Sequence, residues 1–255
     1  ILNRTLKNAC KSATAINGIT EPYVKWGLAK AERERTSIDR SFLHGYISPK
    51  LKKKEKEEGL KFWANFNIHD DTKYLNVCYL GVLGHVYNFS PIIEAARIAN
   101  TDKLPIKFII CGKGPKLKDL KTCSKEIDNL IVPGWIYKNQ IKSLLAISDV
   151  GIAPYQNIFS FINTISNKAA EYLSASLPIA LGINEGILFE KLRKYNAGFS
   201  YSENPRILLR ELLKIKNDLI YFKQIQANAL SLYQKELDAN KIYSQYSEYL
   251  ESLIQ

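Results

Sequence analysis

The sequence of 255 residues contains no methionine, four cysteines and three histidines. The cysteines form no Cys-x-x-Cys pair, and no histidine lies near one at the spacing of a metal site, so we expect no structural metal. Cys78 and Cys111 lie within apolar runs. This placement predicts buried, reduced thiols in a cytoplasmic protein.

Long hydrophobic runs are also missing. No apolar stretch approaches the roughly 20 residues of a membrane-spanning helix, and the first residues lack a basic segment followed by an apolar core. The sequence therefore predicts a soluble chain. Because it begins at Ile1 and has no methionine, we expect either that an upstream portion is missing or that methionine positions have been lost.

Negative charge is in short supply. Lys and Arg number 36 against 25 Asp and Glu, which gives a net charge of +11 and favours anionic partners. In the lysine-rich run 50–58, glutamates are interleaved, which predicts a solvated helix. No stripe of aromatic and basic residues supports nucleic-acid binding, so we expect no nucleic-acid partner.

From residue 76 onward, short apolar runs alternate with amphipathic helical patterns. The runs cover 77–80, 106–111, 130–132, 150–153, 178–181 and 198–201. Continuous apolar strands separated by helices indicate a parallel sheet that is covered on both faces. The predicted fold class is therefore α/β, with a doubly wound, Rossmann-like sheet.

The remaining segments suggest four parts. Residues 1–46 predict a partial N-terminal α/β domain, with a helix ending near Cys10, a strand at 13–16, a helix over 23–34 and an extended run near Phe42. Its few strands indicate the end of a larger domain. We expect a helical connector over 47–75, the Rossmann-like domain over 76–204 and C-terminal helices over 205–255.

Three glycine-bearing turns follow successive predicted strands. They contain Gly81 and Gly84, then Gly112 and Gly114, then Gly134 beside Trp135. Ligands of open parallel sheets bind outside the carboxyl ends of the strands, where glycine lets the backbone approach them closely. Each turn alone is weak evidence, but together they favour a ligand site.

Lys168 and Glu171 stand three residues apart near the start of a predicted helix. They share a helix face, so an ammonium group could bind a phosphate while a carboxylate binds sugar hydroxyls. This combination suits a nucleotide sugar. The alternative is an ordinary exposed ion pair on a helix surface.

In this order, the three glycine turns, the run from Ser148 to Pro154 and the helix start from Asn167 to Leu173 resemble the family 4 (group 1) glycosyltransferases. The resemblance covers roughly residues 75–202. It implies the GT-B architecture, in which two Rossmann-like domains face each other across a cleft. It also implies a retaining, metal-independent enzyme without a cofactor, whose donor substrate is a UDP- or GDP-linked sugar.

The resemblance further implies residue roles. Glu171 would bind the ribose hydroxyls, and Lys168 would act catalytically by stabilising the departing diphosphate. The rest of the implied donor site is Ser166 and Asn167 at the phosphates, Gly81 and Gly84 near the diphosphate, and Gly134 with Trp135 at the nucleobase.

Two positions depart from the family pattern. Asn163 stands where the family has the first glutamate of its Glu-x7-Glu motif, so we assign Asn163 a catalytic position in which it, or Thr164, substitutes by hydrogen bonding. The cations that often follow the first strand are missing, with Val82 and His85 in that neighbourhood. We expect His85 to be a partly solvated structural residue.

The sequence thus predicts a glycosyltransferase that moves a sugar to a glycan or lipid-linked acceptor for polysaccharide or glycolipid synthesis. We expect it in the cytoplasm, where its positive charge would favour peripheral contact with the anionic inner face of a membrane. The alternative is a non-catalytic sugar-nucleotide-binding or scaffold subunit, which Asn163 and the incomplete N-terminal region favour.

Overall fold

The computed structural model describes residues 2–70 and 73–254. A six-stranded parallel sheet with the order β5-β4-β3-β6-β7-β8 lies at its centre. Its strands are β3 (Leu75–Val82), β4 (Ile106–Lys113), β5 (Leu130–Gly134), β6 (Val150–Ala153), β7 (Ile179–Leu181) and β8 (Gly198–Ser200). This confirms the predicted doubly wound α/β fold.

Helices cover both faces of this sheet, because alternate residues of each strand point to opposite sides. Cys78 and Leu80 of β3 enter one hydrophobic cluster, whereas Val77 and Tyr79 enter the other. The first cluster is closed by α3 (Lys53–Ala64), α6 (Lys138–Ala146), α8 (Asn167–Ser174), α9 (Ile187–Tyr195) and α11 (Leu219–Glu236). The second is closed by α4 (Ser90–Thr101), α5 (Leu117–Cys123) and α10 (Pro205–Asn217).

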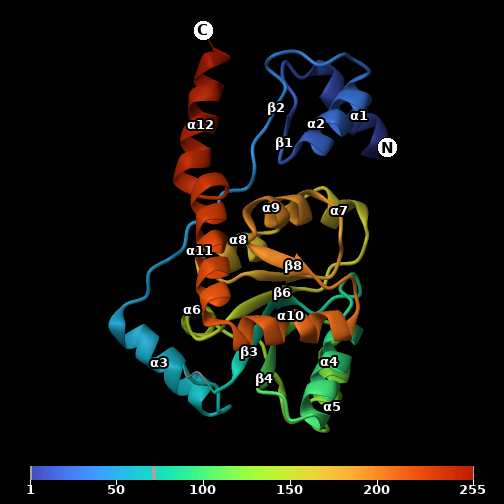
Figure 1. Cartoon of the computed structure of the whole chain (residues 1–255). Helices are drawn as coiled ribbons and strands as arrows, with labels where there is room; N and C mark the ends of the chain where they lie inside the picture. Colours follow the sequence, from blue (N-terminus) through green and yellow to red (C-terminus); the bar gives the residue numbers. More distant parts are fainter. Residues whose placement is uncertain (1, 71–72, 255) are drawn as a thin grey trace.

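A small N-terminal unit lies above α7 (Phe159–Ile162) and α9 in Figure 1. It consists of α1 (Leu2–Ser12), β1 (Asn17–Gly18), α2 (Glu21–Ala31) and β2 (Arg40–Ser41), and its two strands pair in parallel. The predicted order of elements is correct, but the strand expected at 13–16 is wrong by a few residues. The backbone N–H of Ile16 donates to the carboxylate of Asp39 (2.7 Å) instead of to a neighbouring strand.

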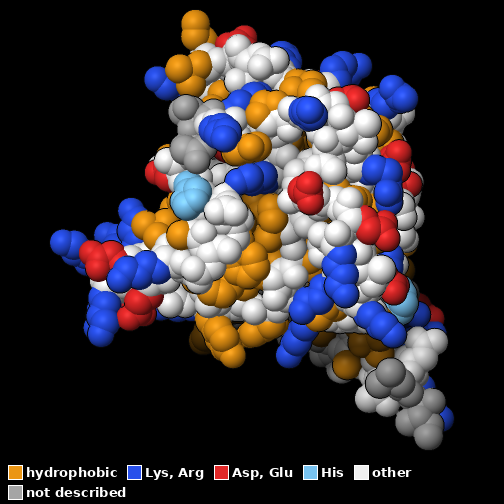
Figure 2. Space-filling view, turned by 90° about the horizontal axis from the view of Figure 1, so that it is seen from below, with side chains coloured by type: hydrophobic (Ala, Val, Ile, Leu, Met, Phe, Trp, Pro, Cys, Tyr) orange, Lys and Arg blue, Asp and Glu red, His pale blue; other side chains and the backbone are white. Residues whose placement is uncertain are grey.

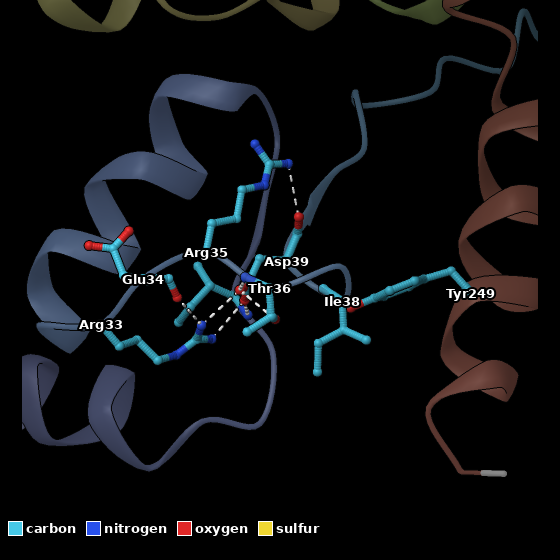
Figure 3. A network of polar contacts seen from close by, with 8 residues as sticks. Arg33, Glu34, Arg35, Thr36, Ile38, Asp39 and Tyr249 are labelled. Atoms are coloured by element: carbon cyan, nitrogen blue, oxygen red, sulfur yellow. Dashed lines mark hydrogen bonds and ion pairs between the residues drawn. The ribbon is translucent and has the colours of Figure 1, made fainter.

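Asp39 organises the N-terminal unit (Figure 3). Its buried carboxylate receives two hydrogen bonds from the Arg33 guanidinium, both of 2.7 Å, and one each from the backbone and hydroxyl of Thr36. These bonds, led by those from Arg33, hold the pKa of Asp39 well below its usual range. The loop between α2 and β2 is therefore fixed around one carboxylate.

Two segments link the N-terminal unit with the domain that contains the six-stranded sheet. The first is the extended segment 42–52 between β2 and α3, which we call the connector, and the second is α12 (Ala239–Ser252), which returns beside the N-terminal unit (Figure 1). Where connector and returning helix meet, the backbone N–H of Tyr46 donates to the carbonyl of Leu237 (2.9 Å), and that of Ala239 donates to the carbonyl of Tyr46 (3.3 Å). Farther along α12, the Tyr249 hydroxyl donates to the carbonyl of Ile38 (2.6 Å).

The predicted connector helix is present as α3, whose charged residues are mostly exposed. Figure 2 shows basic and acidic side chains interspersed at its left edge, the side on which α3 lies in Figure 1. This mixture agrees with a solvated helix. Within the described residues, no helix is both long and apolar enough to cross a bilayer.

Candidate functional site

The three glycine turns lie side by side at the carboxyl ends of β3, β4 and β5. Because β3, β4 and β5 are neighbours, Gly81 pairs with Gly112, and Cys111 pairs with Gly134. At Gly112, φ is +147°, and an added Cβ would lie 1.7 Å from the carbonyl oxygen of Gly81. The first two turns therefore touch backbone to backbone, which only glycine permits.

The order of the strands reverses between β3 and β6, and two loops meet there. Tyr87, after β3, forms an isolated antiparallel bridge with Tyr155, after β6. The Tyr155 hydroxyl is hydrogen-bonded to Ser166, the N-cap residue of α8, whose Oγ also accepts from the backbone N–H of Ala169 (3.2 Å). The first glycine turn and the start of α8 are thus connected through Tyr155.

Lys168 and Glu171 point toward each other on α8. Lys168 Nζ lies 2.9 Å from Glu171 Oε2. The two side chains differ in exposure, with 41% for Lys168 and 9% for Glu171. The pair is therefore more than the exposed surface pair of the alternative reading, since its acidic member is buried.

Two further groups reach the other oxygen of Glu171. The hydroxyl of Tyr46, from the connector, donates to Oε1 (2.7 Å), and Lys142 Nζ of α6 lies 3.5 Å from the same atom. Burial alone would raise the pKa of Glu171, but the Lys168 charge and the Tyr46 hydrogen bond outweigh burial and lower it. Glu171 is held as a carboxylate.

The third turn carries an exposed aromatic ring. Trp135 is 56% exposed, and Lys113 Nζ lies 4.7 Å from the centroid of its ring. Gly134, directly before it, has φ of +92°. An exposed indole at this edge offers a flat surface on which a nucleobase could stack.

Of the other predicted donor-site residues, Gly81, Gly84 and Ser166 are half-buried and Asn167 is exposed. An added Cβ at Gly84 would make ordinary van der Waals contacts, the nearest at 3.7 Å, so lack of space does not require glycine there. Asn167 is exposed at the first position of α8. His85 is exposed in the loop that begins at Gly84.

Asn163 is the residue that caps the C-terminal end of α7. Its side-chain amide donates to the carbonyl of Phe159 (3.0 Å), and its own carbonyl accepts from the hydroxyl of Thr20 in the N-terminal unit (2.6 Å). Asn163 also lines a cavity of about 460 Å³ with Gly186 and with residues of α9. The candidate catalytic position thus borders the N-terminal unit.

Sequence reasoning missed Tyr46 and Lys142 as partners of Glu171, and Lys113 as a cation near the first turn. In the β3 and β4 register, Lys113 is paired with Val82, at the turn where the sequence offered no cation. The glycines on either side of Lys113 were a usable signal. No sequence signal marked Tyr46 or Lys142.

The described residues bring together no group of three His, Cys, Asp or Glu side chains that could hold a metal ion. All four cysteines are free thiols, and Cys78 and Cys111 are buried as expected. Burial raises the pKa of the Cys78 thiol to about 12.

Residues 62–234 match the family model described as glycosyl transferases group 1. The sequence has no significant match among curated proteins. Several solved structures share its fold, and three of them are compared with it below.

HepE of Anabaena, solved in complex with UDP-glucose, has a TM-score of 0.71 and 15% identity, and the match covers 98% of this chain and 67% of HepE. A mutant of S. aureus TarM, solved with fondaparinux, alpha-GlcNAc-glycerol and UDP, has a TM-score of 0.69 and 14% identity, with coverage of 97% and 46%. Sucrose-phosphate synthase from Thermosynechococcus elongatus has a TM-score of 0.71 and 14% identity, with coverage of 99% and 61%. At such identities the similarity concerns the fold, and this chain spans about half to two thirds of these proteins' lengths.

Proposed function

Because the chain belongs to the group 1 glycosyltransferases, we propose that it binds a nucleotide sugar and transfers the sugar to a glycan or lipid-linked acceptor. The donor would lie along the carboxyl-terminal edge of the sheet, from Trp135 to α8. The observation that carries this proposal is the contact between Lys168 and the buried carboxylate of Glu171, at the edge that also bears the glycine turns.

Each part of the donor has a matching group. Trp135 would stack on the base, and Glu171 would accept hydrogen bonds from the ribose hydroxyls. Lys168, together with the free N–H groups at the start of α8, would bind the diphosphate. The backbone of the glycine turns at Gly81 and Gly84 would lie close to the same phosphates.

Sugar transfer requires that charge on the departing diphosphate be stabilised while positive charge develops on the sugar carbon. In this proposal Lys168 and the helix start supply that stabilisation, without a metal or cofactor and with retention of configuration. Asn163 would contact the donor sugar by hydrogen bonding, in place of the family's glutamate. The net charge of +11 would favour work at the cytoplasmic face of an anionic membrane.

UDP is the first ligand to test, since HepE and TarM were both solved with UDP or a UDP-sugar. Isothermal titration calorimetry with UDP, UDP-glucose and GDP-mannose should give saturable binding to the wild-type chain. Lys168→Ala and Glu171→Ala should each weaken nucleotide binding about 10- to 100-fold, because each removes charged hydrogen bonds worth roughly 1.5–3 kcal/mol.

A matched control is the exposed pair Glu94 and Arg97 on α4, which has the same i,i+3 spacing. Glu94→Ala and Arg97→Ala should leave nucleotide affinity within about twofold of wild type. Absence of any nucleotide binding by the wild-type chain would refute the proposed function.

A non-catalytic sugar-nucleotide-binding subunit is the second candidate. It is favoured by Asn163, which stands in place of the family's glutamate and whose side-chain amide donates a hydrogen bond to the carbonyl of Phe159. Release of UDP from UDP-glucose by the wild-type chain would support the enzyme. Tight donor binding with no hydrolysis and no transfer to any glycan acceptor would support the binding subunit.

A further inference from the structure

The two oxygens of Glu171 have different surroundings. Oε2 faces Lys168, whose side chain is 41% exposed and therefore has room to move. Oε1 faces the Tyr46 hydroxyl and Lys142, whose side chain is only 11% exposed. Glu171 thus has an outer oxygen beside a movable lysine and an inner oxygen beside fixed groups.

This asymmetry answers a difficulty in the proposed donor site. When Lys168 turns to a diphosphate, it leaves a carboxylate that is only 9% exposed. A buried charge without a partner is strongly disfavoured, so Lys168 would stay on Glu171 unless another cation remained. Lys142, 3.5 Å from Oε1, is such a cation.

We propose that Tyr46 and Lys142 are positioning residues, which hold the inner oxygen of Glu171 in place and thereby free Lys168 for a diphosphate and the outer oxygen for ribose hydroxyls. This inference rests on the proposed function, because it assigns how the same site takes its nucleotide. It adds the connector and α6 to a site otherwise built from α8 and the glycine turns.

The anchoring of Tyr46 supports this role. Its backbone is bonded on both sides to the junction of α11 and α12, and its carbonyl also accepts from the Tyr233 hydroxyl (2.9 Å). Its own hydroxyl accepts from Lys142 Nζ (2.8 Å) while it donates to Glu171. One hydroxyl therefore connects the inner lysine to the carboxylate.

The charged and titratable groups around Glu171 come from three helices and the connector. Lys168 lies on α8, Lys142 and Lys138 on α6, Tyr233 on α11 and Tyr46 on the connector. Burial raises the pKa of Tyr46, so its hydroxyl remains a donor. Burial lowers the pKa of Lys142, while Glu171 opposes that change.

The chain contains a matched control. On α9, the Tyr195 hydroxyl donates to Glu236 Oε1 (2.7 Å), the same contact and length as between Tyr46 and Glu171. Glu236 also forms an ion pair with Lys191. Tyr195→Phe therefore removes an equivalent hydrogen bond away from the glycine turns.

The test measures UDP affinity of the full chain by calorimetry for Tyr46→Phe, Lys142→Met and Tyr195→Phe, each alone and combined with Glu171→Gln. We expect Tyr46→Phe to weaken UDP binding about 3- to 10-fold and Lys142→Met about 10- to 100-fold. Tyr195→Phe should change it less than about twofold. In the Glu171→Gln background, Tyr46→Phe and Lys142→Met should add less than about twofold each, because they act through the carboxylate.

Lys142→Arg tests whether charge, and not only packing, is required. It should restore most of the affinity lost in Lys142→Met. If Lys142→Met fails to fold, Tyr46→Phe, alone and combined with Glu171→Gln, still tests the inference. In Lys142→Met, nucleotide binding should also be lost at a higher pH on acidification than in wild type, since Glu171 has lost one counter-charge.

Three results would overturn the inference while leaving the proposed function standing. The first is that wild type binds UDP and that Tyr46→Phe and Lys142→Met bind it with the same affinity. The second is that these two substitutions weaken UDP binding as much in the Glu171→Gln background as in wild type. The third is that Lys142→Arg does not restore the UDP affinity lost in Lys142→Met. If the wild-type chain binds no nucleotide, the proposed function fails and this inference falls with it.

Discussion

Asp39 and Glu171 are both buried carboxylates, and they differ in how completely the protein satisfies them. Asp39 receives hydrogen bonds from both Arg33 nitrogens, from the backbone and hydroxyl of Thr36, and from the backbone of Ile16. Glu171 receives one from Tyr46 and one from Lys168, with Lys142 farther away. Asp39 has no acceptor capacity left for a ligand, whereas Glu171 has.

Their partners also differ in kind. Arg33 binds Asp39 with two hydrogen bonds from its rigid, planar guanidinium group. Glu171 is bound instead by the ammonium group of Lys168, whose flexible side chain is partly exposed. A buried carboxylate stabilises the fold when every lone pair is used. It becomes a candidate ligand site when a movable cation covers only part of it.

The largest expected effect separates the two acids directly. Asp39→Ala should lower the free energy of unfolding by about 3 kcal/mol, because it leaves Arg33, the backbone and hydroxyl of Thr36 and the buried backbone N–H of Ile16 without their acceptor. Nucleotide affinity of the folded protein should stay within about twofold of wild type. Urea unfolding measures the free energy of unfolding and calorimetry the nucleotide affinity, and a loss of affinity without a loss of stability would contradict a purely structural role of Asp39.

A pH series gives a second, smaller effect. The pKa of Asp39 lies below its ordinary value of 3.8, so its stabilising contribution is complete above about pH 4 and disappears as the pH falls through the folded-state pKa. The difference in unfolding free energy between wild type and Asp39→Asn should therefore narrow from pH 5 toward pH 2. A difference that stays constant over this range would show that the Asp39 charge contributes nothing.

The smallest expected effect concerns the docking of α12 on the N-terminal unit. Tyr249→Phe removes the hydrogen bond to the carbonyl of Ile38 but keeps the ring beside Phe42. We therefore expect the free energy of unfolding, measured by thermal unfolding, to fall by about 1 kcal/mol. Nucleotide affinity should not change. A weaker nucleotide affinity in this variant would show that the Asp39 region and the Glu171 region are coupled after all.

The parallel sheet could be predicted because each strand is a continuous apolar run bounded by turn residues, and this signal is local. The contact between Lys168 and Glu171 was predictable for the same reason, since both residues stand on one helix. The prediction of a strand at 13–16 was wrong by a few residues, because the apolar residues of this segment suggest that it pairs within a sheet. The partner of Ile16 is a carboxylate that lies 23 residues away.

The rest of the candidate site depends on contacts between distant parts of the chain. Tyr46 is 125 residues from Glu171, in an extended connector whose path follows from its bonds to α11 and α12. Lys142 is one of many lysines on helices, and its partners Tyr46 and Glu171 come from distant parts of the chain. The roles of the donor-site residues remain predictions that the binding experiments address.

The contact between Gly81 and Gly112 has a consequence for what this edge of the sheet can recognise. An added Cβ at Gly112 would lie 1.7 Å from the carbonyl oxygen of Gly81, so a side chain there would force the ends of β3 and β4 apart. The same movement would separate Val82 from Lys113, the next pair in the register, and so shift the cation that lies beside the first turn.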